Sequence, residues 1–345
     1  MNDRQWVELL QILDGQVRDP LPCGFLVDGP WVTGLNGIDL MDYFVDQQVW
    51  LEANLAAAAR YPEIFWLPGF WAEYGMISNP PSFGAKCIWQ ENGFPTCAAV
   101  LGDYDQIDGL AQPNVRSDGL LPLIVRRLER ARDAMETSGH RVRFATAHGP
   151  LTIGSYLMDH TNFFLGMREA PDAIHRLLDK VTRFIIEWLC YQKERFPSID
   201  GLLVLDDLLG FVGDRDFQVF ALPRMRQIFS AVDCSVRFLH NDANGLITAR
   251  YLERMNVNLF NFSFEHDIHE IRQLAGDGVT LMGNVPPRDV LGRGTADDVR
   301  QDVRRLVDSL ADKRRVILSA GGFTPPQFTD DKIRAFRAAA ERSTR

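Results

Sequence analysis

The chain has 345 residues, of which 46% are hydrophobic and 24% are charged, and its formal net charge is −9 at pH 7. This composition can form a large folded core and argues against a disordered chain. The acidic balance argues against a nucleic acid partner, because neutralising phosphates requires a basic stripe and the basic residues here are dispersed among acids.

Cysteine usage and hydropathy indicate the compartment. Five cysteines are widely spaced without any CxxC pair, and no run of about 18 apolar residues occurs. No basic segment followed by an apolar run opens the chain, so we expect neither a signal peptide nor a membrane span. The sequence therefore predicts a cytoplasmic protein with reduced thiols.

Strand-like and helix-like segments alternate along the chain. Residues 2–15 have apolar positions at helical spacing and end at Gly15, which predicts an entry helix. Eight short apolar runs follow, most of them with a helix-like segment after them. The runs are 21–29, 63–70, 141–149, 199–207, 235–242, 257–262, 278–284 and 314–322. This alternation favours parallel strands with helical crossovers, and eight units predict a single-domain α/β (β/α)8 barrel over 1–345. Residues 71–140, rich in Pro, Gly and Asn, are predicted to form an inserted excursion over the barrel mouth.

Polar side chains gather where these runs end. In barrels of this kind the catalytic groups occupy the C-terminal ends of the strands. The residues at or just after those ends are Asp28, Glu73, His148, Asp206, Asp207, His240, Asp242, Glu265 and Asn284. Charged groups there are costly to desolvate unless they are paired, bound to metal or used in chemistry. The alternative is that each acid caps the following helix, although capping does not require histidine.

His240 and Asp242 lie in the stretch SVRFLHNDANG. Two residues apart on an extended chain, their side chains point to the same side and could share one cation. A hydrogen-bonded structural pair in a capped turn is the alternative. With Glu73 as an additional ligand, the predicted metal site is His240, Asp242 and Glu73.

The other strand-end residues are candidates for catalysis and substrate binding. His148 is a candidate for proton transfer or for metal ligation, and its alternative is a buried neutral imidazole. Asp206 and Glu265 are the other catalytic candidates. Predicted substrate-binding residues are Asp28, Asp207, Asn284 and Trp71, the last in a glycine-rich aromatic loop that fits a flat or methylated organic compound. His266 and His269 are expected to begin a helix.

Several stretches together resemble one family. They are HGPLTIGSYLM (148–158), REAPDAIHRLLDKVT (168–182), LLVLDDLLGFV (202–212), FLHNDANG (238–245), LMGNVPPRDVL (281–291) and ILSAGGFTPPQFTDDKIRAF (317–336). In order and spacing they resemble the uroporphyrinogen decarboxylase superfamily, which includes zinc-dependent methylcobamide:coenzyme M methyltransferases. The resemblance implies a (β/α)8 barrel with its site at the C-terminal mouth. It also matches Tyr156 to the tyrosine of the decarboxylase site, which makes Tyr156 a catalytic candidate.

The departures from that family concern its substrate and its metal. The decarboxylase grips porphyrinogen carboxylates with an arginine-rich motif near its N-terminus, where this chain has GFLVDGPWVTG. The methyltransferases hold zinc with a histidine, a cysteine two residues later and a cysteine in the final strand end. Those positions fall on His240, Asp242 and Gly321. Zinc would then require an oxygen-rich shell, which suits an O-methyl or N-methyl substrate better than a thiol.

Three functions remain open at this point. The first is a metal-assisted methyltransferase that moves a methyl group between a small organic substrate and a corrinoid on a carrier protein. The second is a metal-free decarboxylase of an aromatic or tetrapyrrole acid. The third, motivated by the missing thiolates, is a barrel that binds a ligand without catalysis. The decarboxylase relatives pair with themselves, so a homodimer is a further option.

Overall fold

The computed structural model describes residues 1–90 and 93–341. Its eight parallel strands are β1 (Gly24–Leu26), β2 (Phe65–Leu67), β5 (Phe144–His148), β6 (Gly201–Leu205), β7 (Val236–Asn241), β8 (Leu259–Phe262), β9 (Thr280–Val285) and β10 (Val316–Ala320). Each of them overlaps one of the eight predicted apolar runs.

Neighbouring strands in the barrel are also neighbours in the chain order of the parallel strands, apart from the step that joins β1 to β10. Six are hydrogen-bonded as β10-β9-β8-β7-β6-β5, and β1 pairs with β2 in parallel. A bridge between Cys23 and Leu318 joins these groups, and the Leu318 amide donates to the Pro22 carbonyl at 2.9 Å. The complete order, β2-β1-β10-β9-β8-β7-β6-β5, is that of a (β/α)8 barrel, as predicted. In the described residues no ladder joins β2 to β5.

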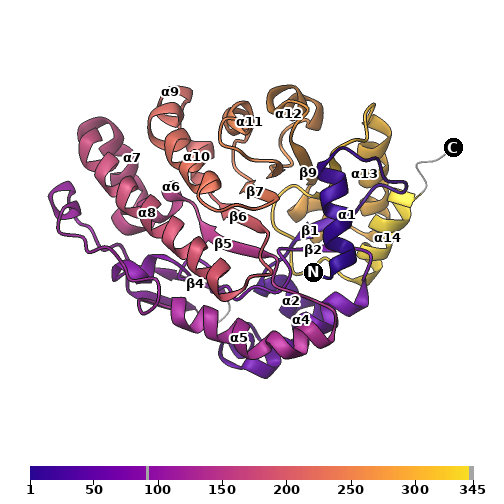
Figure 1. Ribbon diagram of the computed structural model, residues 1–345. Helices are drawn as coiled ribbons and strands as arrows, with labels where there is room; N and C mark the ends of the chain where they lie inside the picture. Colours follow the sequence, from indigo (N-terminus) through magenta and orange to yellow (C-terminus); the bar gives the residue numbers. More distant parts are fainter. Residues whose placement is uncertain (91–92, 342–345) are drawn as a thin grey trace.

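Helices surround the strands (Figure 1). They are α1 (Asp3–Leu13), α2 (Gly29–Asn36), α3 (Leu40–Val45), α4 (Gln47–Arg60), α5 (Leu121–Thr137), α6 (Pro150–Met158), α7 (His160–Glu169), α8 (Pro171–Arg195), α9 (Asp214–Asp216), α10 (Leu222–Ser230), α11 (Leu246–Tyr251), α12 (Ile268–Ala275), α13 (Ala296–Ser309) and α14 (Asp330–Glu341). Shorter helical turns are η1 (Pro80–Phe83), η2 (Tyr104–Ile107), η3 (Asp207–Phe211), η4 (Phe217–Ala221) and η5 (Pro287–Gly292). Among the helices of residues 1–90 and 93–341, none is long and apolar enough to cross a membrane.

Buried side chains fill the barrel interior, and α1 packs against its N-terminal end. One cluster of buried side chains draws members from all eight parallel strands, among them Leu26, Phe65 and Phe238, and includes four residues of α1. Helix α1 begins with a capping box between Asn2 and Gln5. Trp6 on this helix meets Phe144 edge to face, with 5.4 Å between ring centroids. Because α1 closes this end with apolar side chains, a functional site is left to the opposite end.

The strand register brings the two strand-end histidines to one level. His148 is paired with Leu205, Leu205 with His240, and His240 with Asn261. The row lies where β5 to β8 reach their C-terminal ends. His148 and His240 therefore face the same end of the barrel with one strand between them.

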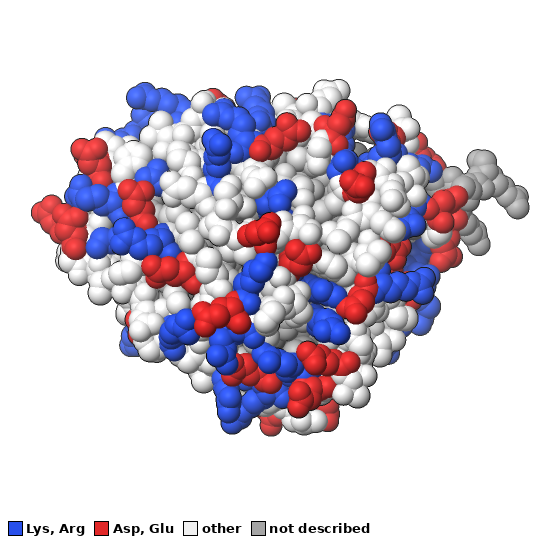
Figure 2. Space-filling view, in the orientation of Figure 1, with Lys and Arg blue, Asp and Glu red and all other residues white. Residues whose placement is uncertain are grey.

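The segment 71–140 contains η1, η2, α5 and an antiparallel hairpin of β3 (Cys87–Gln90) and β4 (Gly93–Cys97). It contributes Met76, Asn79, Phe94 and Ile124 to the lining of a cavity at the barrel mouth. On the face seen in Figure 2, acidic and basic side chains are interspersed, and neither sign forms a broad patch.

Candidate metal and substrate site

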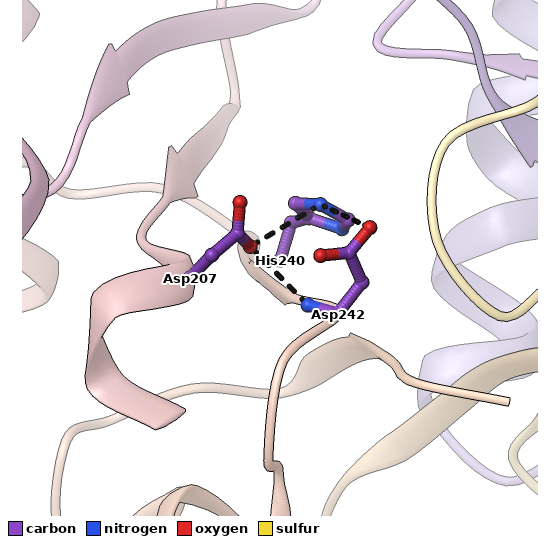
Figure 3. A group of neighbouring side chains, drawn as sticks. All are labelled: Asp207, His240 and Asp242. Carbon is purple, nitrogen blue, oxygen red and sulfur yellow. Dashed lines mark hydrogen bonds and ion pairs between the residues drawn. The ribbon is translucent and has the colours of Figure 1, made fainter. Parts of the chain in front are cut away.

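A histidine and two aspartates meet at the C-terminal end of the barrel (Figure 3). His240 Nε2 lies 3.5 Å from Asp207 Oδ1 and 3.8 Å from Asp242 Oδ2. The Asp242 amide donates to Asp207 Oδ1 at 3.2 Å, which ties the two acidic segments together. One ligand atom from each residue lies within 4.8 Å of the others. Imidazole nitrogen and carboxylate oxygen are both common ligands of zinc and of other divalent metals.

The orientation of His240 is fixed by Asn261 on β8. Asn261 Nδ2 donates to the carbonyls of Met282 and Ala320 at 2.8 and 3.0 Å, which leaves Oδ1 to face the imidazole. His240 Nδ1 lies 2.8 Å from that oxygen and must therefore donate to it. Nε2 is therefore the ring nitrogen that faces the two carboxylates, and it is buried and has no hydrogen-bond partner. This arrangement of a second residue holding the ring is typical of metal-ligating histidines.

Asp207, at the start of η3, faces both the cluster and the cavity. Burial raises the pKa of this carboxyl above its ordinary value, the imidazole of His240 opposes the shift, and the carboxylate of Asp242 adds to it. A carboxylate in this position gains from a cation nearby, because a positive charge offsets both the desolvation and the repulsion from Asp242.

Asp206, the neighbouring aspartate, has a different role. It is fully buried and accepts from the amides of Leu151 and Thr152 and from the Thr152 hydroxyl, all within 3.1 Å. These are groups of the first turn of α6, so the carboxylate caps that helix. Burial raises the pKa of Asp206 to about 7 despite these bonds. Asp206 does not line the cavity, so its position fits the alternative given above, in which a strand-end acid caps the following helix.

A cavity of about 200 Å³ opens beside the cluster. Its walls are largely apolar, with Trp71, Phe94, Trp188 and Phe323 among them, and Phe323 also meets His240 edge to face at 4.8 Å. Such a volume fits a small organic molecule.

His148, at the end of β5, lines the same cavity. Asn79 Oδ1 accepts from the His148 backbone amide at 2.9 Å and lies 3.1 Å from its Nδ1. The bond from the backbone amide identifies this Asn79 atom as the oxygen, which can only accept. Nδ1 of His148 therefore donates to it, and in the neutral ring Nε2 carries the lone pair. Burial lowers the pKa of His148 to about 4, which keeps the ring neutral near pH 7.

Asp28 and Glu73 form a second acidic group in the cavity. Asp28 caps α2 through the Trp31 amide at 3.2 Å, and Glu73 accepts from the amides of Gly29 and Gly75 at 2.8 and 2.7 Å. Both Glu73 oxygens are thus engaged by backbone, and Glu73 lies outside the His240 cluster. Of the predicted set of His240, Asp242 and Glu73, the structure brings His240 and Asp242 together, and Asp207 lies beside them in place of Glu73.

Asp28 gives an expected pH dependence of stability. Burial, and then the charge of Glu73, raise the pKa of Asp28 to about 8, whereas an unfolded chain has an aspartate pKa of about 3.9. The folded state binds this proton more tightly, so its stabilisation is complete below about pH 4 and is lost as the pH rises to about 8. We expect the free energy of unfolding, from urea titrations, to fall over this range with a slope of up to about 1.4 kcal/mol per pH unit from Asp28.

Asp28→Asn should flatten that slope, since asparagine still caps α2 but does not ionise. The raised pKa of Asp206 contributes to the pH dependence of wild type and of Asp28→Asn alike. The difference between their two stability profiles therefore reports Asp28 alone. Asp39→Asn, at the exposed cap of α3, is the matched control. Parallel profiles for wild type and Asp28→Asn would contradict the assignment.

The final strand end leaves no room for a cysteine side chain at Gly321, the position to which the resemblance assigns the second thiolate. A Cβ on Gly321 would lie 2.5 Å from the backbone nitrogen of Phe264, so a side chain there requires the backbone to move. At Gly322, where φ is +134°, a Cβ would lie 2.8 Å from Asp242 Oδ2. These two positions therefore carry no ligating side chain, and Gly322 leaves space for the Asp242 carboxylate.

The remaining predicted residues lie in different places. Trp71 lines the cavity, with its indole donating to the Val27 carbonyl. Tyr156 packs edge to face on His160, and burial raises its pKa, with Cys97 and Asp207 contributing less. Glu265 is exposed and outside the cluster. Asn284 donates to the carbonyl of His266 at 2.6 Å, and so supports the loop after β8. Neither Tyr156, Glu265 nor Asn284 lines the cavity.

His266 and His269 lie at the start of α12, as expected. His266 precedes the helix and accepts from the Gly245 amide at 2.9 Å through Nε2, whereas His269 lies within the helix and is exposed. Neither residue joins the cluster.

The family model for uroporphyrinogen decarboxylase (URO-D) matches residues 8–343. The chain belongs to this family. Among curated relatives, a uroporphyrinogen decarboxylase from Pseudomonas syringae pv. syringae is 22% identical over 300 residues, 83% of this chain and 81% of the relative. The enzyme of the same name from Syntrophotalea carbinolica is 25% identical over 179 residues, about half of either chain (50% and 51%).

A solved structure, a methyltransferase from Methanosarcina mazei, superposes with a TM-score of 0.80 at 18% sequence identity. The match covers 96% of this chain and 97% of that one. At this identity the likeness shows the shared fold. The curated relatives are enzymes, each named as a uroporphyrinogen decarboxylase, whereas the solved structure that shares the fold is named as a methyltransferase.

Several residues of the site were missed by sequence reasoning. Asn261 orients His240, Asn79 orients His148, and Trp188 forms part of the cavity wall. Asn261 had one usable signal, because an amide within the apolar run VNLFNF must find partners when the strand is buried. Asn79 lies in an irregular segment, where sequence spacing carries no such information.

Proposed function

We propose that the protein is a metal-assisted, corrinoid-dependent methyltransferase that acts on a small O- or N-methylated organic substrate. The observation that carries the proposal is His240 Nε2, a buried nitrogen without a hydrogen-bond partner, oriented by Asn261 toward two carboxylates. A buried polar atom left unpaired costs about 1–3 kcal/mol, which a bound cation would recover.

The donor set fits a divalent metal. His240 Nε2, Asp207 Oδ1 and Asp242 Oδ2 would hold it, leaving further positions for substrate or water. When bound, such an ion supplies Lewis acidity to an oxygen or nitrogen of the substrate. The absence of thiolate ligands from the cluster favours these hard donor atoms over a substrate thiol.

The residues around the cavity have separate roles in this proposal. Asp207 joins the cluster to the cavity, so a substrate held there lies next to the ligand atoms. His148 presents the unprotonated Nε2 and can accept and hold a proton from a substrate hydroxyl or amine. Trp71, Phe94 and Trp188 exclude water from the apolar part of the substrate.

Decarboxylation of an aromatic or tetrapyrrole acid is the second candidate. The names of the curated relatives favour it. The cavity favours it less, because none of its described lining residues is a lysine or arginine that could pair with a carboxylate. The corrinoid carrier and the homodimer stay predictions.

Methyl transfer to free cob(I)alamin tests the proposal directly. Methylated ethers and amines are offered to the purified protein, and transfer is followed by the loss of the cobalt(I) absorbance. We expect transfer from at least one donor, its loss after treatment with dipicolinate, and its recovery with added zinc. Turnover that survives complete removal of metal would contradict the proposal, and metal-independent release of carbon dioxide from aromatic acids would establish the decarboxylase instead.

A further inference from the structure

The charges around the cavity have one sign. Three of its described lining residues are acidic, namely Asp28, Glu73 and Asp207, and none is lysine or arginine. His148, the one imidazole in the lining, is neutral near pH 7, since burial lowers its pKa to about 4. An anionic ligand would therefore meet only repulsion from formal charges here, whereas a cation would meet attraction.

Arg127 on α5 is a basic residue whose charge acts on Glu73, but its guanidinium already donates to backbone carbonyls. It is buried, and it donates to the carbonyls of Tyr43 and Phe44 at 3.4 and 2.7 Å. Its guanidinium also lies 5.3 Å from the ring centre of Tyr74. Arg127 lowers the pKa of Glu73 against the larger effect of burial, and it does not line the cavity. It offsets part of the Glu73 charge without being available to a ligand.

The tryptophans of the cavity offer ring surfaces and no free donors. The Trp71 indole N–H donates to the Val27 carbonyl at 3.2 Å, and that of Trp188 to the Thr146 carbonyl at 3.0 Å. With Phe94 and Phe323, these rings line the same cavity as the acidic pair Asp28–Glu73 and as Asp207. The faces of aromatic rings attract organic cations by about 0.5–2 kcal/mol each, most strongly where water is excluded.

We propose that this cavity binds a small organic ammonium ion, with the aromatic rings around its alkyl groups and the Asp28–Glu73 pair as its counter-charge. The inference rests on the proposed function in one respect, since it names an N-methylated cation as the substrate class. The binding itself does not depend on methyl transfer, on a corrinoid or on a metal.

Calorimetric titration of the full-length protein, stripped of metal with a chelator, tests the proposal. The first probe is choline. The second is 3,3-dimethylbutan-1-ol, its neutral isostere with a tert-butyl group in place of trimethylammonium, and the third is 3,3-dimethylbutanoate, an anion of similar size. The titrations are run at about pH 9, so that Asp28, whose pKa is about 8, is ionised. We expect choline to bind at least about tenfold more tightly than the neutral isostere, and the anion to bind most weakly.

Two variants locate the binding. Asp28→Asn keeps the cap of α2 and removes one charge, and should weaken choline binding about tenfold without changing affinity for the neutral isostere. Asp39→Asn, on the exposed cap of α3, should change neither affinity. Equal affinities for choline and its isostere, no binding of choline, or unchanged choline affinity in Asp28→Asn would each overturn the proposal. If choline binds as expected but no methyl transfer is found, the proposed function fails and the ammonium site stands.

Discussion

Replacing His240 by alanine should abolish metal binding while leaving the barrel folded. His240 supplies the one nitrogen of the cluster, and its Nε2 is fixed toward Asp207 and Asp242 by the bond from Nδ1 to Asn261. Loss of a residue that merely orients a ligand typically costs 10–100-fold in metal affinity, so loss of the ligand itself should exceed about 100-fold. Equilibrium dialysis with zinc, followed by elemental analysis, measures this.

Two further variants separate ligation from folding. Asn261→Leu should lower zinc affinity by about 10–100-fold, because the ring keeps its place on β7 but loses its orientation and its defined tautomer. His269→Ala removes an exposed imidazole of α12 and should have no effect. Stoichiometric zinc in folded His240→Ala would show that the cluster is not the binding site, and methyl transfer unchanged in that variant would remove the metal from the proposed function.

The two adjacent aspartates after β6 should respond to substitution in opposite ways. Asp206→Ala leaves the amides of Leu151 and Thr152 and the Thr152 hydroxyl without an acceptor in a fully buried position. We expect this variant to lose about 3 kcal/mol or more in free energy of unfolding. Asp207→Asn should leave stability unchanged or slightly raised, since it removes a carboxylate that is repelled by Asp242, and should lower zinc affinity at least about tenfold.

Urea unfolding and zinc titration of both variants measure the contrast. Asp206→Asn is the milder companion, because an amide oxygen can still accept from α6 and should retain part of the stability. The assignment would be reversed if Asp206→Ala kept its stability and lost zinc binding while Asp207→Asn did the opposite.

The order of strands followed from local patterns in the sequence. Apolar runs such as SVRFLHN and RRVILSA, each bounded by turn residues, coincide with β7 and β10, because strand burial imposes a pattern visible in a few consecutive residues. The fixed direction of parallel strands then places every C-terminal end on one face. His148, His240 and Asp242 could therefore be placed at the C-terminal mouth of the barrel from the sequence alone.

The partners of these residues were decided by the tertiary structure. Sequence order does not say which of Asp206 and Asp207 turns toward the first turn of α6, and only the packing of that helix assigned the cap to Asp206. Glu73 follows β2 and joins Asp28, which follows the neighbouring β1, because the amides of Gly29 and Gly75 engage its two oxygens. Asn261 reaches His240 across adjacent strands. The sequence determined which residues arrive at the mouth of the barrel, since that depends on local periodicity. Their grouping into the cluster of His240, Asp207 and Asp242 and the pair of Asp28 and Glu73 depends on contacts between segments distant in the chain, which only the folded structure defines.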